Sequence, residues 1–527
     1  MPRLAQARPS ADRPLAGRRT RVLAIATACA ACLAIGVGLW QLASATADLT
    51  VVRARAGTVP VTVFAPVSER KSPVIVIAHG FAGSQQLMQP FAVTLARNGY
   101  LAVTFDFPGH GRNPTPLPGG LADYAMRTQA LLSALAAVTD FSQELPSSDG
   151  RLALIGHSMA SDVVVRYADS NPGVQATVAV SLFLSRGISP SSPRNLLVVD
   201  GALESRMLLV EGERIVQMSG GATAQPGVTY GSFAVGTARR FALAPGVEHI
   251  GVLYSRHSLA EALQWIDQAF GRHGSGFVDA RGPWLGLLYL GLVALAWPLS
   301  RLLPRVVAVP RGEGCRGRVL VVAAVAPALL TPLILWRIPA DFLPILLGDY
   351  LVLHFGLYGL LTATCVWMVR RPREEAPRPS VSWGKFAAAA LAASAYATLA
   401  TGLPTNTFVT SLAPTGARLW LIPVMLLGTF PYFVADEWLT RGGAAPRGAY
   451  AVTKVCFLLS LMLAIALNLE RLFFLVIIVP AMLAFFVVYG LFSAWAYRQT
   501  NDPRVGATAN AIAFAWAIAA TFPIVTR

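Results

Sequence analysis

The chain has 527 residues, of which 54% are apolar and 13% charged, and its formal net charge at pH 7 is +16. This composition is typical of a membrane protein and argues against a wholly soluble one. Residues 48–280 hold 17 basic and 17 acidic side chains, so the excess positive charge lies in the N-terminal tail and the C-terminal half. Because the central part is neutral, we expect no nucleic-acid partner.

The first 47 residues combine a basic tail with an apolar stretch. Six arginines precede Val22, and an apolar segment follows at Val22–Ala45. That segment is long enough to cross about 30 Å of hydrocarbon. We therefore expect a basic cytoplasmic tail over 1–21 and a transmembrane anchor over 22–47. A signal peptide that ends near Ala43-Ser44-Ala45 is the alternative.

Residues 48–275 alternate between short apolar runs and helical patterns, and a hairpin at 49–55 and 59–64 is expected first. Buried strands are expected after it at 73–78, 100–105, 152–155, 177–183, 195–199 and 240–244. Helical patterns separate them at 88–98, 121–139, 161–169, 204–217 and 258–270. This alternation predicts an α/β domain with a doubly wound, mostly parallel sheet.

One short run in this domain predicts catalytic chemistry. Gly156-His157-Ser158-Met159-Ala160 stands between an expected strand and an expected helix. In this context a serine is held on a tight turn with its hydroxyl exposed. Ala160 takes the place of the usual last glycine, at a slight steric cost. Taken alone, the five residues could also be an ordinary turn at a helix start.

Two further turns accompany this run. His79-Gly80-Phe81-Ala82-Gly83 follows one expected strand, and Asp106-Phe107-Pro108-Gly109-His110-Gly111 follows the next. With these motifs, and an acid and a histidine after the serine, residues 49–271 resemble the α/β-hydrolase superfamily. The resemblance implies that fold and the activity of a serine hydrolase.

The resemblance also implies the catalytic residues. In this fold the order along the chain is serine, acid, histidine, which makes Ser158 the nucleophile and His249, after the last strand, the base. Relatives commonly place the acid three residues past a glycine such as Gly201, which selects Glu204. Asp200, at the strand end, is the alternative acid.

Stabilisation of the negative charge that develops on the substrate needs backbone donors as well. The N–H groups of Phe81 and Met159 are the expected oxyanion hole. His79 and His110 are expected to make structural hydrogen bonds, and His157 to point away from the nucleophile. No metal-ligand cluster, phosphate-binding loop or dinucleotide motif is present in the sequence, so we expect no metal and no cofactor.

The remainder, 276–527, predicts a membrane domain of about eight helices. Eight apolar stretches lie at 283–303, 319–336, 342–368, 386–403, 419–435, 450–469, 472–496 and 506–525. Basic residues concentrate in alternate short loops. By the positive-inside rule this predicts a multi-pass protein of the cell membrane, with a cytoplasmic N-terminus and with the hydrolase domain and C-terminus outside.

Ionisable residues within the apolar stretches are candidates for function, because such groups are costly in lipid. They are Asp349, His354, Asp436, Glu437 and Lys454. Asp349 and His354 are expected on different faces of one helix. Asp436 and Glu437 are expected at a solvated membrane interface.

Two classes of function are compatible with the sequence. The first is a membrane-anchored serine hydrolase that cleaves a small-molecule or lipid ester, or alternatively an amide or thioester. The second is a transport or scaffold protein, bound to membrane lipids, whose hydrolase-like domain binds a ligand without catalysis. The segment 184–194 leaves no room for a sizeable helical cap over the site.

Overall fold

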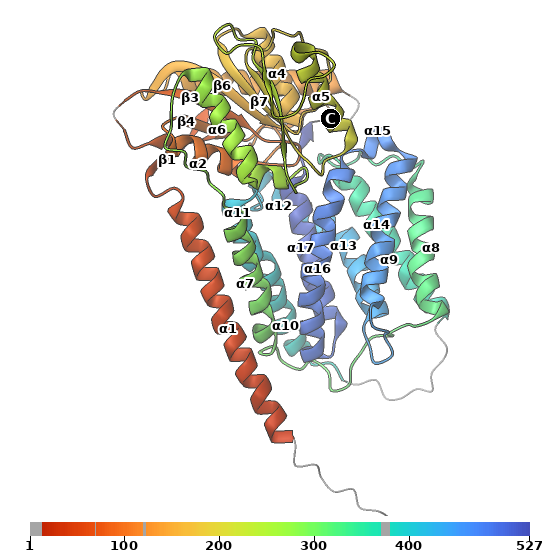
Figure 1. Cartoon of the computed structure of the whole chain (residues 1–527). Coiled ribbons are helices and arrows are strands. Elements are labelled where there is room, and N and C mark those ends of the chain that lie inside the picture. Colours follow the sequence, from red (N-terminus) through yellow and green to blue (C-terminus); the bar gives the residue numbers. More distant parts are fainter. Residues whose placement is uncertain (1–12, 69, 120–122, 370–379, 527) are drawn as a thin grey trace, which may run out of the picture.

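The computed structural model describes residues 13–68, 70–119, 123–369 and 380–526. An α/β domain lies at one end of a bundle of long helices (Figure 1). The first part of the expected basic tail and most of the basic segment around 370–379 lie outside the described residues.

A nine-stranded sheet in the order β1-β2-β4-β3-β6-β7-β8-β10-β9 forms the centre of the α/β domain. The strands are β1 (Leu49–Ala56), β2 (Val59–Pro66), β3 (Ser72–Ala78), β4 (Leu101–Phe105), β6 (Ser148–His157), β7 (Val174–Val180), β8 (Leu196–Gly201), β9 (Thr229–Tyr230) and β10 (Arg239–Ala244). Strands β4, β3, β6, β7, β8 and β10 run parallel, and β1, β2 and β9 pair antiparallel. The predicted α/β-hydrolase fold is confirmed.

Helices cover both faces of the sheet: α2 (Gln89–Arg97), α3 (Tyr124–Gln143), α4 (Met159–Ser170), α5 (Arg206–Gly220) and α6 (Arg256–Phe270). Alternate residues of β3 point to opposite faces. Val74 and Val76 belong to the apolar cluster that includes α3 and α4, and Ile75 and Ile77 to the one that includes α2 and α6. Burial on both faces explains why β3 and β4 are continuous apolar runs.

Strand β7 begins and ends three residues before the expected 177–183. It pairs with β6 from Val174 and with β8 up to Val180. Ser181 then adopts a positive φ of 55°, outside the extended region of a strand, so the chain leaves the sheet there. The apolar residues that follow belong to the turn beside the site.

The bundle contains α1 (Arg13–Ser44), α7 (Gly282–Ser300), α8 (Arg318–Leu335), α9 (Gly348–Val369), α10 (Trp383–Ala395), α11 (Thr401–Phe408), α12 (Gly416–Leu419), α13 (Leu421–Thr440), α14 (Ala449–Leu467), α15 (Leu469–Leu472), α16 (Leu475–Thr500) and α17 (Pro503–Thr521). A five-residue π-helical segment joins α10 and α11 into one rod. In the described part of the chain, eight helices are long and apolar enough to cross a membrane.

Nine spans were expected, and the ninth, 506–525, is not among those eight. Its residues form most of α17, which is rich in alanine and is largely buried within the bundle. Helix α17 packs against α13, α16 and α10, so its small side chains serve contact between helices rather than contact with lipid. It still traverses the bundle, since Thr500 lies at the far end and Ile524 bonds to the α/β domain.

The expected anchor, α1, is packed along α7. Gly38 and Gly291 lie at this contact, where a Cβ on Gly38 would come 3.0 Å from the Cβ of Leu288. A Cβ on Gly291 would approach the carbonyl oxygen of Ala31. Small residues at such positions let two helices approach closely within a membrane.

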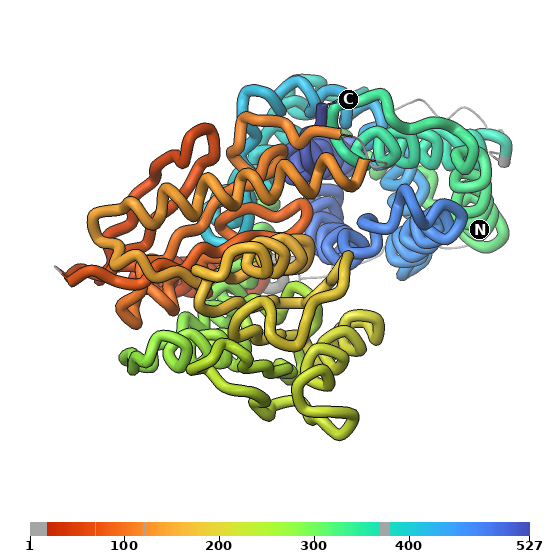
Figure 2. Tube along the Cα trace, turned by 90° about the horizontal axis from the view of Figure 1, so that it is seen from above, coloured from red at the N-terminus to blue at the C-terminus, as the bar shows by residue number. Residues whose placement is uncertain are grey.

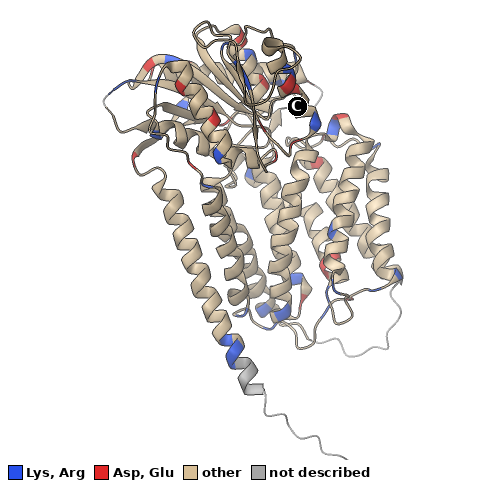
Figure 3. Cartoon of the chain, in the orientation of Figure 1, with Lys and Arg blue, Asp and Glu red and all other residues tan. Residues whose placement is uncertain are grey.

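Most basic residues of the bundle lie at the end away from the α/β domain (Figure 3). In the described residues these are Arg18, Arg19, Arg21, Arg301, Arg305, Arg311, Arg316, Arg318, Lys385, Arg441, Arg447, Arg498 and Arg504. The end near the α/β domain carries Arg281, Arg337, Arg418 and Arg471.

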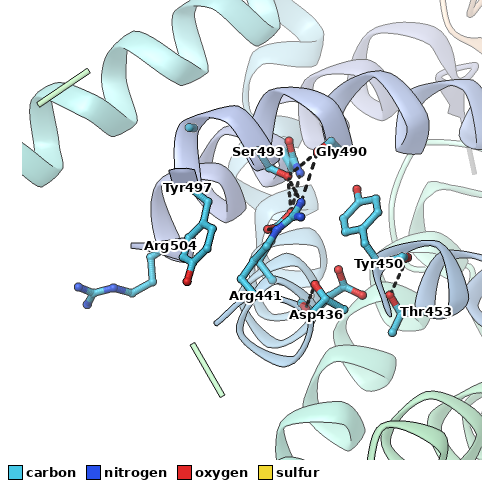
Figure 4. Close-up of polar contacts among 12 residues, drawn as sticks. Asp436, Arg441, Tyr450, Thr453, Gly490, Ser493, Tyr497 and Arg504 are labelled. Atoms are coloured by element: carbon cyan, nitrogen blue, oxygen red, sulfur yellow. Dashed lines mark hydrogen bonds and ion pairs between the residues drawn. The ribbon is translucent and has the colours of Figure 1, made fainter. Parts of the chain in front are cut away.

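The expectation of a solvated position for Asp436 and Glu437 is wrong. Both side chains are buried, because α13 continues past the apolar stretch and packs against α14 and α17. Asp436 pairs with Lys454 of α14, and Glu437 pairs with Arg441 at 2.7 Å. Arg441 also points toward α16, where it donates to Ser493 (Figure 4). Asp436 and Glu437 therefore each have a partner of opposite sign, as a structural role requires.

The two polar residues of α9 have different surroundings. Asp349 lines a cavity at the end near the α/β domain. His354 is buried farther along α9, where its ring nitrogens lie 3.2 Å from the hydroxyl of Ser460 and 3.3 Å from that of Tyr350. Asp349 and His354 lie on different faces of α9, as their spacing of five residues along the helix indicates.

The α/β domain and the bundle are joined by a buried arginine and by the C-terminus. Arg418 is 1% exposed, and its guanidinium donates to Gly109 of the α/β domain at 2.6 Å and to Phe522 after α17 at 2.6 Å. A short strand, β11 (Val525–Thr526), pairs with β5 (Leu117–Pro118) of the α/β domain. Seen from above, the dark-blue C-terminal end of the chain lies next to an orange segment of the α/β domain (Figure 2).

We predict that Arg418→Met weakens this junction. The change leaves buried carbonyl groups without a donor, and hydrogen bonds to a charged group contribute about 1.5–3 kcal/mol each. Thermal unfolding of the full chain in detergent should occur at a clearly lower temperature. Arg337→Met, at an exposed arginine of the same end, is the control, and equal effects of the two would contradict the assigned role of Arg418.

Candidate active site

Ser158 stands at the sharp turn between β6 and α4. Its backbone has φ 54° and ψ −119°, a conformation that is costly for a residue with a side chain. The turn is tight because Gly156 has no side chain, since a Cβ there would overlap the carbonyl oxygen of Ala160. Ala160 itself is accommodated in full burial. The strain is held by the strand on one side and the helix on the other.

The structure brings the three residues expected to act together into one line. His249 Nε2 lies 3.0 Å from Ser158 Oγ, and His249 Nδ1 lies 2.9 Å from Glu204 Oε2. The His249 side chain is 21% exposed, whereas that of Glu204 is completely buried. A serine hydroxyl needs a base within hydrogen-bond distance, and the base needs a group that orients it. The arrangement meets both requirements.

Glu204 is fixed by its second carboxylate oxygen. Oε1 accepts hydrogen bonds from the hydroxyl of Ser181 at 2.7 Å and from the N–H of Gly201 at 2.9 Å. The positive φ of Ser181 places this hydroxyl at the acid. Oε2 therefore remains for His249.

Asp200, the alternative acid, does not lie at His249. Its Oδ1 accepts from the N–H of Leu182 at 3.1 Å. Burial, and next the charge of Glu204, raise the pKa of Asp200 well above its ordinary value. A carboxyl group with a raised pKa keeps its proton more readily than the acid of a catalytic triad can, because that acid must be ionised to stabilise an imidazolium.

The three other histidines near the site are buried. Burial lowers the pKa of His79, and it lowers that of His110 to about 3. Burial, and next the charge of His249, lower the pKa of His157 well below its ordinary value. All three are therefore neutral at pH 7. His157 Nε2 lies 3.0 Å from the carbonyl oxygen of His249, and so contacts the backbone of the base rather than Ser158.

The turn after β3, in which Phe81 is expected to supply one oxyanion donor, lies against Ser158. Gly80 permits this approach, because a Cβ there would lie 3.0 Å from the Cβ of Ser158. His79 Nε2 accepts from the N–H of Phe107 at 3.2 Å, so its Nδ1 carries the proton and donates to the oxygen of Gly80 at 2.8 Å. This pair of bonds holds the turn. The second expected donor, the N–H of Met159, is the first of α4 and has no acceptor within the helix.

One contact of the site was not expected from the sequence. The ring of Phe81 stacks on that of Phe474, between α15 and α16, with centroids 4.4 Å apart. Two residues that are 393 positions apart thus meet beside the expected oxyanion hole. Nothing local in the sequence marks this contact, because it depends on how the two parts dock.

Among the described residues, no group of three His, Cys, Asp or Glu side chains could hold a metal ion. Ser158, His249 and Glu204 are linked to one another by hydrogen bonds. Their arrangement suits acyl transfer by the side chains alone.

Comparison with known proteins agrees with the fold. Residues 69–199 match the family model described as serine aminopeptidase, S33. No curated protein matches the chain in sequence.

Several solved structures that resemble the α/β part are described as hydrolases. A protein from Klebsiella pneumoniae described as a dienelactone hydrolase is 14% identical, with a TM-score of 0.32, and the match covers 43% of this chain and 99% of that one. A protein from Thermoplasma acidophilum described as a CIB-like hydrolase is 16% identical, with a TM-score of 0.31 and 42% and 98% covered. An epoxide hydrolase from Vigna radiata is 20% identical, with a TM-score of 0.22 and 28% and 43% covered.

We predict that the two acids respond differently to amidation. Glu204→Gln should slow labelling of Ser158 by a fluorophosphonate by about 10³–10⁴-fold, because a neutral amide neither orients nor stabilises the imidazole properly. Asp200→Asn changes a carboxyl group that bonds to the N–H of Leu182 and not to His249, and should label within about tenfold of the wild-type rate. The reverse order of the two rates would assign the acid to Asp200.

Proposed function

We propose that this protein is a membrane-anchored serine hydrolase that cleaves esters. The supporting observation is the line from Ser158 through His249 to the buried carboxylate of Glu204, at 3.0 and 2.9 Å. The match to a serine hydrolase family model over 69–199 supports the same class. The strained turn at Ser158 supports it too, because such strain persists where the surroundings enforce it.

In the proposed reaction Ser158 Oγ attacks the carbonyl carbon of the ester, and its proton passes to His249 Nε2. The N–H groups of Phe81 and Met159 bind the oxyanion. The carbon–oxygen bond to the alcohol then breaks, and the alcohol takes the proton from His249. Water, deprotonated by His249, attacks the acyl-serine, the bond between the acyl carbon and Ser158 Oγ breaks, Oγ takes the proton back from His249, and the carboxylic acid is released. Glu204 remains ionised and accepts the Nδ1–H bond throughout.

We propose further that the α/β domain and the C-terminus lie outside the cell membrane and the basic helix ends inside. The supporting observation is the concentration of arginines at the bundle end away from the α/β domain, given in Figure 3. Basic loops are retained on the cytoplasmic side during insertion. The close contact of α1 with α7 at Gly291 supports an anchor that stays attached rather than a cleaved signal peptide.

We predict that Ser158→Ala abolishes labelling by a fluorophosphonate and reduces ester turnover by several orders of magnitude, as does His249→Ala, because these residues act as a unit. Ser68→Ala, at an exposed serine of the same domain, should behave as wild type. Near-normal turnover of Ser158→Ala would refute the proposed mechanism.

The orientation has its own test. A reporter fused at Gly274 and one fused after the last residue should both be active only outside the cell. A fusion within 441–447, at the basic end of α13, should report the cytoplasm. A cytoplasmic signal at Gly274 would reverse the orientation and with it the location of the active site.

A further inference from the structure

The edge of the sheet that carries Ser158 rests on the helical bundle. The turn after β3 contacts the segment after α11, where Ser84 Oγ accepts from the N–H of Ser411 at 2.7 Å. Next to it, Gln86 donates to the carbonyl of Asn406 at 3.1 Å. The turn after β4 is held by Arg418 at Gly109. The carboxyl ends of parallel strands, where α/β enzymes bind ligands, therefore face the membrane part of this chain.

The bundle lies next to the site on a side where the α/β domain has no helical cap of its own. The chain from Ser181 to Asn195, after β7, contains no helix and no strand. Phe474 of the bundle instead lies on Phe81 beside the expected oxyanion donor. Phe81, Met159 and Phe474 pack against one apolar cluster that includes residues of the sheet and of the bundle, among them Leu472. One wall of the site thus comes from the bundle.

A cavity of about 630 Å³ lies in the bundle, within the usual range for a site that binds a small amphiphile. Its lining includes Leu346, Tyr350, Leu472 and Val525, with Glu470 and Arg471 among the charged groups. Leu472 is two positions from Phe474. Val525 follows Ile524, whose N–H donates to Gly109 at 2.9 Å. Residues that line the cavity are therefore close in sequence to residues that contact the turns around Ser158.

Farther along the same sheet edge, large apolar side chains are exposed in the loop after β7, around Glu204 and the start of α5, and next to His249. They form an apolar rim, defined as Phe183, Leu203, Met207, Val210 and Ile250, which are 38–67% exposed. Soluble proteins keep such patches small unless the patch binds something. The rim belongs to the same carboxyl-end edge of the sheet as the turns after β3 and β4, which contact the bundle.

We propose that the bundle completes the substrate site, and that the substrate is an ester carried in the lipid leaflet on the side of the α/β domain. The rim contacts the leaflet, the apolar chain of the ester lies against the bundle at Phe474, and the ester group reaches Ser158 without crossing water. Ser158 and His249 are both partly exposed, as this approach requires. The inference rests on the proposed function and adds the source of the substrate.

The test uses the full chain in phosphatidylcholine vesicles with two fluorogenic esters, a long-chain oleate dissolved in the bilayer and a water-soluble butyrate. Three variants are compared with wild type. Met207→Glu/Val210→Glu places two charges in the rim, and Phe474→Ala removes the bundle wall. Val235→Glu places a charge at an apolar position that is more exposed than either, before β10 at the opposite sheet edge.

The ratio of kcat/KM for oleate to that for butyrate should fall about tenfold or more in the rim variant, because charged groups there no longer bury apolar surface in lipid. It should fall in Phe474→Ala as well and remain unchanged in Val235→Glu. Fluorophosphonate labelling of Ser158 shows that each variant is folded.

Two negative outcomes are distinguishable. If Ser158 is labelled and butyrate is cleaved, but the rim variant and Val235→Glu give the same ratio as wild type, the lipid-borne substrate is refuted and the hydrolase remains. If wild type cleaves neither ester and Ser158 is not labelled, the proposed function fails, and this inference fails with it.

Discussion

The buried guanidinium of Arg418 sets the relation between chemistry and membrane in this protein. Its nitrogens bond to the turn after β4 and to the end of α17, and the described C-terminal residues add a strand pair at the same place. A buried arginine is costly unless its donors are used, so these bonds favour one docked position. That position places the carboxyl ends of the parallel strands, where the candidate site lies, against the bundle.

Within the α/β domain, a second constraint acts on a smaller scale. Ser158 has a positive φ, and Gly156 must lack a side chain for α4 to start so close to β6. The strain is sustained because β6 pairs with strands on both sides and α4 packs on the sheet. The rigid turn at Ser158 fixes Oγ relative to His249, as proton transfer between the two side chains requires.

The parts that could be predicted from the sequence are those in which burial dictates composition. Strands such as β3 are apolar throughout because both faces are covered, and the elbow is marked by local glycine and serine. Contacts between distant segments leave no such mark. Phe474 looks like one more apolar residue of a span. Asp436 and Glu437 follow an apolar stretch and so resemble a helix end, although Lys454 on another helix allows them to be buried. Strand β7 was misplaced because its last expected residues, although apolar, belong to the turn that positions Glu204.

The lack of a cap after β7 bears on how such a site can exclude water. Acyl transfer is helped when the oxyanion donors act in surroundings of low dielectric constant. A short loop over Ser158 does not provide such surroundings. An aromatic pair between Phe81 and Phe474 provides apolar cover on one side of the donors, and a lipid leaflet against the apolar rim would provide it on the other. A hydrolase built in this way has its low-dielectric surroundings only while it is docked on its own membrane helices, so the bundle would be a part of the catalyst and not merely its anchor.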